Sequence, residues 1–323
     1  WLKSFSIQAA FCLSTEANAE AVLSMVPQRF FVLLVFFVCL TATGFWNFKV
    51  PRLSCMQERV IASSGLEAFR PTAADNCFNV FVDAGSNLGV HGRFLFEPDK
   101  YPDANRTTKL FDAILGDVSM RRENTCVFAF EPNPVHKTHQ LLTATSYATM
   151  GWKYHYMPMG VGKKNATLNF YHNRRFNNGR VHEEVGFSTV KKDRKSQPVA
   201  VAVLDVAEWL KQVLKRRLPD AKPEWGQPKI LMKLDIEGME ISLVPHLLTE
   251  GILCKIYPFG EVHTVFGPYN LENGTVIGTS EVTAWFDNMN KILAADGCPS
   301  TFQYLDDECY EHDGMPYPSP TRL

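Results

Sequence analysis

The chain has 323 residues, of which 46% are hydrophobic and 21% are charged, a composition typical of a globular protein with a sizeable core. Its 33 Lys and Arg residues are balanced by 34 Asp and Glu residues, so the formal net charge is -1. Acidic and basic residues are mixed along the chain, without the overall basic excess that marks many nucleic-acid-binding proteins. We therefore expect no nucleic-acid partner.

The N-terminal part of the chain differs in character from the rest. Residues 1–29 show no clear periodicity and form an N-terminal extension in which Met25 is a candidate start. Residues 30–46 are almost wholly apolar, and their length is near the lower limit of about 17 residues for a membrane span. A signal anchor, a cleaved signal peptide and a buried core helix remain open for this run, in that order of preference. Residues 47–76 are expected to be a stem or linker.

Three Asn-x-Thr triplets follow the apolar run, at Asn105, Asn165 and Asn273. Such triplets are acceptors for N-glycosylation in the secretory pathway. Both leading interpretations of residues 30–46 send the chain into that pathway. We therefore expect a single-pass membrane protein of the endoplasmic reticulum or Golgi, attached through residues 30–46 if they are uncleaved, with its folded part in the lumen.

The eight cysteines include no Cys-x-x-Cys pair, which argues against a zinc ribbon or a thioredoxin-type site. Disulfides can form if the folded part lies in an oxidising compartment, and Cys298 with Cys309 is the closest candidate pair in the sequence. The alternative is a set of buried thiols.

Residues 77–323 alternate short apolar runs with longer mixed segments, which predicts one domain with an α/β fold. The expected strands are 79–83, 126–131, 154–159, 166–171, 199–204, 229–235 and 254–262. The expected helices are near 88–97, 134–147, 205–217, 240–250 and 280–295. Residues 97–124, with a short helix expected at 108–116, are interpreted as an insertion between the first two βα units.

The first expected strand ends at Asp83 and runs into a turn that contains Gly85 and Gly89. Open α/β sheets bind nucleotide-like ligands beyond the carboxyl end of a strand. Glycine at such a place lets a ligand approach the backbone closely. An ordinary tight turn explains the same residues equally well, so this motif gains weight only from the strand ends that follow.

Three further apolar runs end in acidic residues. Glu131 ends the second strand, where a nucleoside-binding sheet has an acid that accepts hydrogen bonds from both ribose hydroxyls. Asp235 and Glu237 follow a later run, and the two-residue repeat of strand side chains predicts that they face the same side. The last run ends at Glu261 and is followed by His263, which is a candidate general base. The alternatives are a surface acid at a strand end for Glu131, a capped helix start without chemistry for Asp235 and Glu237, and a structural role for His263.

Three neighbouring charged residues have structural explanations. Lys233 precedes Asp235 and is expected to neutralise a neighbouring acid, because several charges at a buried strand end are costly unless they pair. Glu240 opens a helix, where a negative charge is favourable. Asp205 is expected to be a helix N-cap.

Four segments occur along the chain in the order Asp83-Ala-Gly-Ser-Asn-Leu-Gly89, Phe130-Glu131-Pro132-Asn133-Pro134, Val203-Leu204-Asp205 and Lys233-Leu-Asp-Ile-Glu-Gly-Met-Glu240. Together they resemble the FkbM-type family of S-adenosylmethionine-dependent methyltransferases. The Lys-x-Asp-x-Glu-Gly-x-Glu segment is the most specific part of this resemblance. The resemblance implies a Rossmann-like class I methyltransferase fold, with a doubly wound, mostly parallel, seven-stranded sheet and S-adenosylmethionine as the cofactor.

Carried over residue by residue, the resemblance implies that Asp83, Gly85, Asn87 and Gly89 surround the methionine part of the methyl donor. It implies in the same way that Glu131 binds the ribose hydroxyls.

The resemblance also implies that Asp235 and Glu237 line the site of methyl transfer, with His263 at a matching strand end. One of these three residues would accept the proton of the acceptor hydroxyl. A divalent metal on the two carboxylates is the weaker option because no third ligand is evident, so no metal is expected.

In the FkbM-type family the acceptor is commonly a hydroxyl oxygen, often on sugars or polyketide-like products. Together with the N-terminal run and the three triplets, this leads us to expect a glycan or glycoconjugate acceptor. The alternatives are a small hydroxylated metabolite or a lipid as the acceptor, and a non-catalytic binding protein on the same fold. The sequence predicts no oligomeric state.

Overall fold

The computed structural model describes residues 71–172, 175–177, 180–182, 186–191, 194–216, 226–261, 269–270, 276–298, 301–305, 314 and 316–318. The apolar run 30–46 and His263 lie outside these residues. Within the described part of the chain, no helix combines the length and the apolar character that a membrane span requires.

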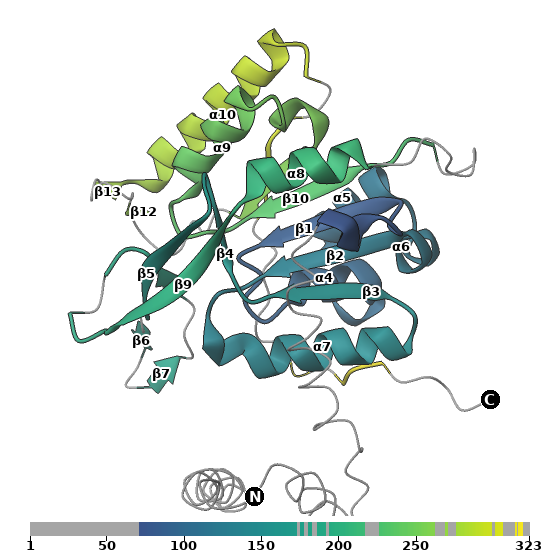
Figure 1. The fold of residues 1–323 in the computed structure, drawn as a ribbon, viewed down its shortest axis with the longest axis horizontal. Helices are drawn as coiled ribbons and strands as arrows, with labels where there is room; N and C mark the ends of the chain where they lie inside the picture. Colours follow the sequence, from purple (N-terminus) through teal and green to yellow (C-terminus); the bar gives the residue numbers. More distant parts are fainter. Residues whose placement is uncertain are drawn as a thin grey trace, which may run out of the picture. The chain divides into compact units, whose positions relative to one another are not determined.

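The centre of the fold is a six-stranded parallel sheet with the strand order β14-β11-β10-β1-β2-β3 (Figure 1). Its strands are β1 (Asn79–Ala84), β2 (Thr125–Phe130), β3 (Lys153–Met157), β10 (Ile230–Leu234), β11 (Tyr257–Glu261) and β14 (Gln303–Leu305). Counted along the chain, these strands run 3-2-1-4-5-6 across the sheet, the order of a doubly wound nucleotide-binding sheet. The order reverses between β1 and β10, and such sheets bind ligands at the carboxyl ends of the two strands at this reversal.

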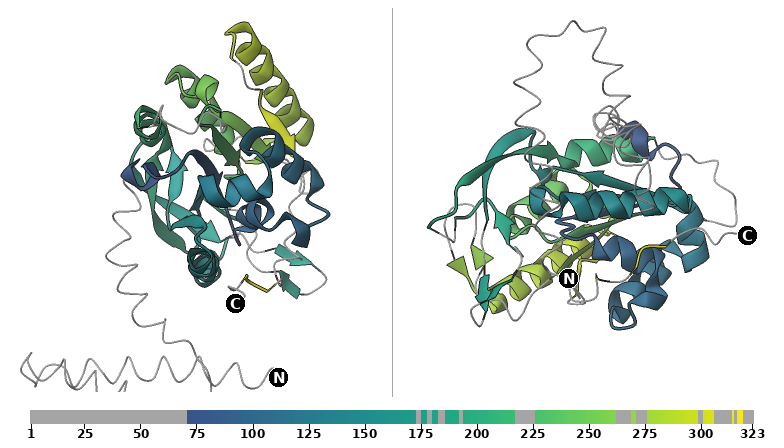
Figure 2. Two further views of the ribbon diagram at one scale, coloured as in Figure 1. Left: turned by 90° about the vertical axis from the view of Figure 1, so that its right-hand side faces the viewer. Right: turned by 90° about the horizontal axis from the view of Figure 1, so that it is seen from below.

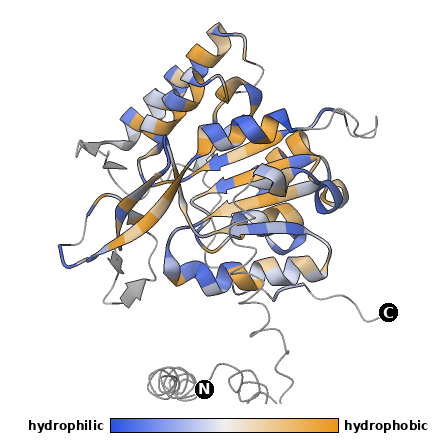
Figure 3. Cartoon of the chain, in the orientation of Figure 1, coloured by the Kyte–Doolittle hydropathy of each residue, from blue (hydrophilic) through white to orange (hydrophobic). Residues whose placement is uncertain are grey.

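Helices cover both faces of the parallel sheet (Figure 2). One face packs against α8 (Val206–Lys215), α9 (Glu240–Thr249) and α10 (Thr279–Ala295). The other face packs against α4 (Val90–Phe96), α5 (Asn105–Leu115) and α7 (Lys137–Thr149). Every residue of β1 and β2 is buried, which explains why both strands are nearly continuous apolar runs (Figure 3).

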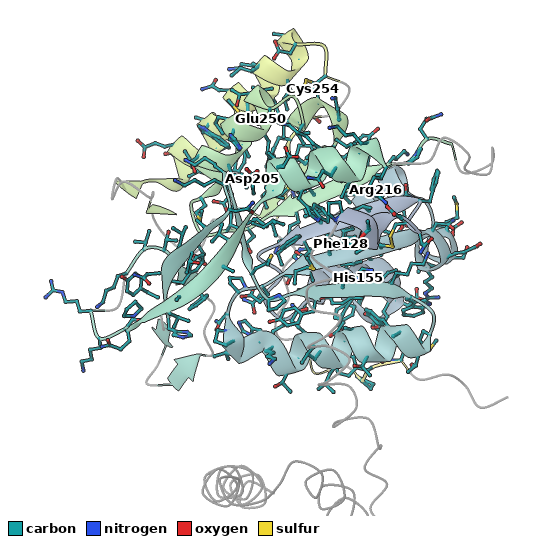
Figure 4. The ribbon with its side chains drawn as sticks, in the orientation of Figure 1. Phe128, His155, Asp205, Arg216, Glu250 and Cys254 are labelled. Carbon is teal, nitrogen blue, oxygen red and sulfur yellow. A yellow bond between two sulfur atoms is a disulfide. The ribbon has the colours of Figure 1, made fainter. Side chains whose placement is uncertain are left out.

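A histidine in β3 belongs to the core on the α8 face. His155 stacks on Phe128 of β2 with ring centroids 4.8 Å apart (Figure 4), and Trp209 of α8 meets Phe128 edge-on at 5.1 Å. Burial lowers the pKa of His155 to about 4. A neutral imidazole in an aromatic core is a packing group, so His155 is no candidate for a general base.

Short elements complete the described fold. They are η2 (Pro71–Ala74), η3 (Pro98–Lys100), α6 (Val118–Asn124), η4 (Pro134–His136), η6 (Leu253–Lys255), and the antiparallel pair β12 (Tyr269–Asn270) and β13 (Val276–Ile277). η2 contributes the fully buried Ala74 to the core that includes α8. The folded part of the chain therefore includes residues before Cys77.

Residues 160–205, called the arm below, connect β3 to α8. The arm contains a four-stranded sheet of order β4-β9-β5-β8 and a separate antiparallel pair. The strands are β4 (Gly160–Gly162), β5 (Ala166–His172), β6 (Arg175–Asn177), β7 (Arg180–His182), β8 (Phe187–Ser188) and β9 (Pro198–Asp205). In Figure 1 the arm lies on the side toward which the arrowheads of β1, β2 and β10 point, so it is next to the carboxyl ends of these strands.

The observed architecture confirms the α/β class and changes its detail. Each predicted strand has an observed counterpart, but those predicted at 166–171 and 199–204 pair with each other in the arm instead of joining the parallel sheet. β14 was not predicted. Among the described residues the parallel sheet therefore has six strands, and a seventh is not observed. The predicted insertion 97–124 holds α5 and α6.

Two disulfides join the described segments. Cys77 is bonded to Cys126, and Cys254 in η6 is bonded to Cys298 after α10 (Figure 4). The Cα atoms of the two pairs are 5.5 and 4.7 Å apart, within the range that a disulfide spans. The candidate pair Cys298 with Cys309 is wrong, because Cys298 is bonded instead to Cys254, 44 residues earlier in the chain.

The proline-rich C-terminal segment packs on α4 and α7. The carbonyl oxygen of Pro316 accepts hydrogen bonds from Arg93 at 3.2 Å and from Lys100 at 2.7 Å. The carbonyl oxygen of Pro318 accepts one from the Ser146 hydroxyl at 2.7 Å. Since the Arg93 side chain is fully buried, this segment supplies a hydrogen-bond acceptor that the buried guanidinium needs.

Candidate active site

Four charged side chains lie at the carboxyl ends of β1, β2 and β10, with Asp83 and Lys233 in the last two positions of their strands and Glu131 and Asp235 directly after theirs. Asp83, Glu131 and Lys233 are buried, and the Asp235 side chain is 15% exposed. Strand side chains alternate between the two faces of a sheet. All four residues continue the phase of the odd-numbered strand residues that pack beneath α4. They therefore gather on the α4 side of the sheet, where its strand order reverses.

The turn after β1 is fixed to β2 by its backbone. The amides of Gly85 and Ser86 both donate to the carbonyl oxygen of Phe130, at 3.0 Å. Asn87 has a φ of 49° and Gly89 a φ of 82°, left-handed conformations that turn the chain sharply into α4. The predicted glycine turn is present and begins at the reversal of strand order.

The glycines of this turn are required by the protein itself. A Cβ atom on Gly85 would lie 1.8 Å from the carbonyl oxygen of Asp235. A Cβ atom on Gly89 would lie 2.5 Å from the Tyr154 hydroxyl. The expectation that these glycines make room for a ligand therefore needs correction, because protein atoms from β3 and the end of β10 fill the space.

Gln140 of α7 holds the turn from the side. Its Nε2 donates to the carbonyl oxygen of Asn87 at 2.7 Å and to the Ser86 hydroxyl at 2.9 Å. Its Oε1 accepts a hydrogen bond from the Tyr154 hydroxyl at 2.7 Å. Gln140 is fully buried, so these bonds satisfy a polar group that would otherwise be costly. Sequence reasoning missed Gln140 and Tyr154, because neither stands at a strand end.

Glu131 is held by two backbone amides. Asn87 N donates to its Oε2 and Asn133 N donates to its Oε1, both at 2.7 Å. Burial raises the pKa of Glu131 to about 7, while these two hydrogen bonds and the charge of Lys233 act in the opposite direction. Each carboxylate oxygen accepts more than one hydrogen bond. Glu131 therefore retains capacity for two hydroxyl donors of a ligand.

Lys233 joins the ends of β1 and β10. Its Nζ donates to the carbonyl oxygen of Gly85 at 3.0 Å. The same atom lies 3.4 Å from Asp235 Oδ2 and 3.7 Å from Asp83 Oδ1. The prediction that Lys233 neutralises neighbouring acids is confirmed. A buried ammonium needs such partners to offset its loss of water, so Asp83 is a partner of Lys233 in addition to any contact with a ligand.

The turn after β10 is clamped by Glu240. Its Oε2 accepts a hydrogen bond from Gly238 N at 2.7 Å, and its Oε1 accepts one from Ile236 N. Burial raises the pKa of Glu240 to about 7, and the charge of Asp235 acts in the same direction. Glu240 is the first residue of α9, as predicted, and its carboxylate fixes the loop that carries Asp235.

The prediction that Asp235 and Glu237 face the same side assumed that both residues continue a regular strand. β10 ends at Leu234, and Asp235 N still donates to the carbonyl oxygen of Ala84 at 3.0 Å, but the two-residue alternation of a strand does not extend to Glu237. Glu237 has a φ of 59°, a left-handed conformation that is uncommon for a residue with a Cβ atom. Asp235 is joined to the cluster by its contact with Lys233.

The remaining predicted residues lie elsewhere. His263 is outside the described residues, so it is not included in the candidate active site. Asp205 caps α8 by accepting a hydrogen bond from Glu208 N at 3.0 Å (Figure 4), which confirms its structural role. Within the described residues, no group of three or more His, Cys, Asp or Glu side chains is placed to hold a metal ion.

A cavity of about 180 Å³ lies at the other end of the parallel sheet. It is lined by Asn79 at the start of β1, Lys229 just before β10 and Asp112 of α5, among others. The acidic strand ends are at the carboxyl edge of the sheet, so this cavity is separate from the candidate active site.

No protein-family model, curated protein or solved structure matches this chain. The chemistry of the candidate active site is therefore inferred from its own residues.

Proposed function

We propose that this protein is an S-adenosylmethionine-dependent O-methyltransferase of the FkbM type, and that it methylates a hydroxyl of a glycan or glycoconjugate. The proposal includes a class I methyltransferase fold. The observation that carries it is the Glu131 carboxylate, held by the amides of Asn87 and Asn133 at the point where the strand order reverses. An acid at this place suits the two adjacent hydroxyls of a ribose.

The donor set fits S-adenosylmethionine. Glu131 would hold the ribose, and the turn Gly85–Gly89 would border the methionine part of the cofactor. Asp83 and Asp235 provide negative charge near this turn, and Lys233 balances part of it. A cationic sulfonium ligand is favoured where acids outnumber bases, as they do in this cluster.

The bound cofactor would supply an electrophilic methyl group. The protein then has to orient the acceptor hydroxyl in line with that methyl and take up its proton. Asp235 is the base that we favour among the three predicted residues, because it is partly exposed and fixed by Lys233 at 3.4 Å. Glu237 and His263 remain the other two candidates.

Two observations support a lumenal location. The pairs Cys77–Cys126 and Cys254–Cys298 are disulfides, which persist in oxidising compartments and are rare in the cytosol. Asn165 of the second Asn-x-Thr triplet is exposed in the turn between β4 and β5, where a glycan can be accommodated. A lumenal location also requires that residues 30–46 direct the chain into the secretory pathway as a signal anchor or signal peptide.

Calorimetry with S-adenosylmethionine tests the proposal. The wild-type protein should bind the cofactor, and Glu131→Ala should abolish binding because the ribose hydroxyls lose their acceptor. Glu123→Gln is a matched control, since this acid is exposed on α6 away from the cluster. Absence of binding by the wild-type protein would refute the proposal. Transfer of a labelled methyl group to a panel of glycans, metabolites and lipids would then identify the acceptor class.

A further inference from the structure

The arm is far more basic than the rest of the chain. Residues 163–195 contain nine Lys and Arg residues and three Asp and Glu residues, a net charge of +6, whereas the whole chain has a net charge of -1. The even mixture of charges described above therefore holds for the chain as a whole and fails for this segment. A local excess of this size attracts anions over a distance of about 10 Å at moderate salt.

Five cations of the arm are exposed, in two groups. Lys191, Arg194 and Lys195 are exposed at the tip from which β9 starts, and Figure 3 shows this tip in the hydrophilic colour. Lys163 and Lys164 are exposed in the turn between β4 and β5. The basic residues are thus presented at two separate places along one elongated sheet.

Between these two places the arm has a face of small and polar side chains. Thr167 pairs with Ala202 and Asn169 pairs with Ala200 across β5 and β9, and all four side chains are exposed. Tyr171 follows on the same face of β5, and Lys191 lies 5.6 Å from its ring centroid. Such a face offers hydrogen-bonding groups and one aromatic ring without large exposed aliphatic side chains.

The inner end of the arm adjoins the candidate active site. A Cβ atom on Gly162 of β4 would lie 3.9 Å from the Cε of Met239. Met239 directly precedes Glu240, whose carboxylate clamps the loop that carries Asp235. The added Cβ would also lie 2.8 Å from Val203, so this contact is on the face of the arm opposite to Ala202, and it places the inner end of the arm beside the loop where we place acceptor activation.

We propose that the arm binds the acceptor and that the acceptor is an anionic glycan, whose sulfate or carboxylate groups contact Lys191, Arg194 and Lys195. This inference rests on the proposed function and specifies its substrate class. Anionic glycans combine hydroxyl groups for methylation with the charge that the arm complements. An anionic membrane is a poorer partner, because membrane-bound surfaces insert large apolar side chains and the exposed face of β5 and β9 has small ones.

The test measures binding of the full 323-residue chain to heparin, to polygalacturonate and to neutral dextran. The Lys191→Ala/Arg194→Ala/Lys195→Ala variant should bind the two anionic polymers at least tenfold more weakly at low salt, and this difference should shrink as salt rises. Lys109→Ala/Lys255→Ala/Lys291→Ala removes the same charge from exposed positions outside the arm and should leave binding unchanged. Both variants should keep the wild-type affinity for S-adenosylmethionine.

The outcomes separate this inference from the proposed function. If the wild-type protein binds S-adenosylmethionine but binds the anionic polymers no better than dextran, the inference fails and the proposed function stands. If the two triple variants lose affinity equally, the arm is not the binding surface. Tighter binding to duplex DNA or to phosphatidylserine vesicles than to either anionic glycan would also overturn the inference. Failure to bind S-adenosylmethionine would instead refute the proposed function.

Discussion

The parallel sheet and the arm differ in the exposure of their charged side chains. At the carboxyl ends of β1 and β10, Lys233 and Asp83 are fully buried, and backbone groups and ion pairs hold them in place. In the arm, Lys191 and Arg194 are exposed. Buried charges need every partner to be in position, whereas exposed charges act through a field that salt screens. We therefore expect changes near the sheet to alter stability and donor binding, and changes in the arm to alter acceptor binding.

The largest effect is expected for Gly85→Ala. The new Cβ atom would lie 1.8 Å from the carbonyl oxygen of Asp235, and the φ of 79° is left-handed. Overpacking and the unfavourable backbone conformation together should lower the free energy of unfolding by about 3–5 kcal/mol, measured by urea denaturation. Gly151→Ala is the control, with a similar φ of 77° and no atom near its added Cβ, and should cost about 1 kcal/mol. Equal losses in the two variants would show that the approach of Asp235 to Gly85 is not what requires glycine.

A smaller effect is expected for Gln140→Leu. This change keeps the size of the side chain and removes the hydrogen bonds to Asn87, Ser86 and Tyr154. Loss of these hydrogen bonds in the buried region should lower the free energy of unfolding by about 2 kcal/mol. Because the turn Gly85–Gly89 would be held less firmly, the protein should also bind S-adenosylmethionine about tenfold more weakly. Gln212→Leu, which removes an exposed bond to Glu208 on α8, should affect neither quantity. Unchanged cofactor affinity in Gln140→Leu would mean that Gln140 supports the fold without positioning the turn.

The pH dependence of cofactor binding tests Glu131. Its pKa is raised to about 7 by burial, so below that pH the carboxyl group is mainly protonated and has to lose its proton to accept two hydroxyl donors. Affinity for S-adenosylmethionine should therefore increase about tenfold from pH 6 to pH 8 and level off above. Glu131→Gln should bind weakly and without this pH dependence. A flat profile in the wild-type protein would show that Glu131 is ionised throughout this range, and wild-type affinity in Glu131→Gln would contradict its role in ribose binding.

The smallest effect on stability is expected in the arm. Replacing Lys191, Arg194 and Lys195 with alanine should change the free energy of unfolding by less than about 0.5 kcal/mol, because all three side chains are exposed. Thermal unfolding of this triple variant beside the wild type provides the measurement. A loss comparable to that of Gln140→Leu would mean that these cations stabilise the fold, and the contrast between the two regions would no longer hold.

Sequence patterns located the strand ends because burial leaves a strong signal. β1 and β2 are buried on both faces and read as continuous apolar runs that stop at Asp83 and Glu131. The same patterns did not separate the arm from the parallel sheet. The sequence nevertheless contains a feature that distinguishes the arm. β5 alternates Thr167 and Asn169 with apolar neighbours, and such alternation is typical of an antiparallel sheet with one solvent-exposed face.

The hydrogen bonds that connect the residues of the site could not be predicted from the sequence. Gln140 in a helix and Tyr154 in a strand look ordinary, and their importance comes from tertiary proximity to the turn at Gly89. The left-handed conformation of Glu237 is set by the clamp of Glu240 on the loop after β10. Regular alternation could not anticipate it, since alternation ends where the strand ends.

The buried guanidinium of Arg93 has a consequence for the timing of folding. One of its acceptors is the carbonyl oxygen of Pro316, 223 residues further along the chain. A ribosome that adds about 5–20 residues per second needs on the order of ten seconds or more to reach that proline after it has made Arg93. During synthesis, all residues of α4 are therefore present long before Arg93 has all of its partners. The side of the domain formed by α4 and α7 should be among the last regions to reach its final packing.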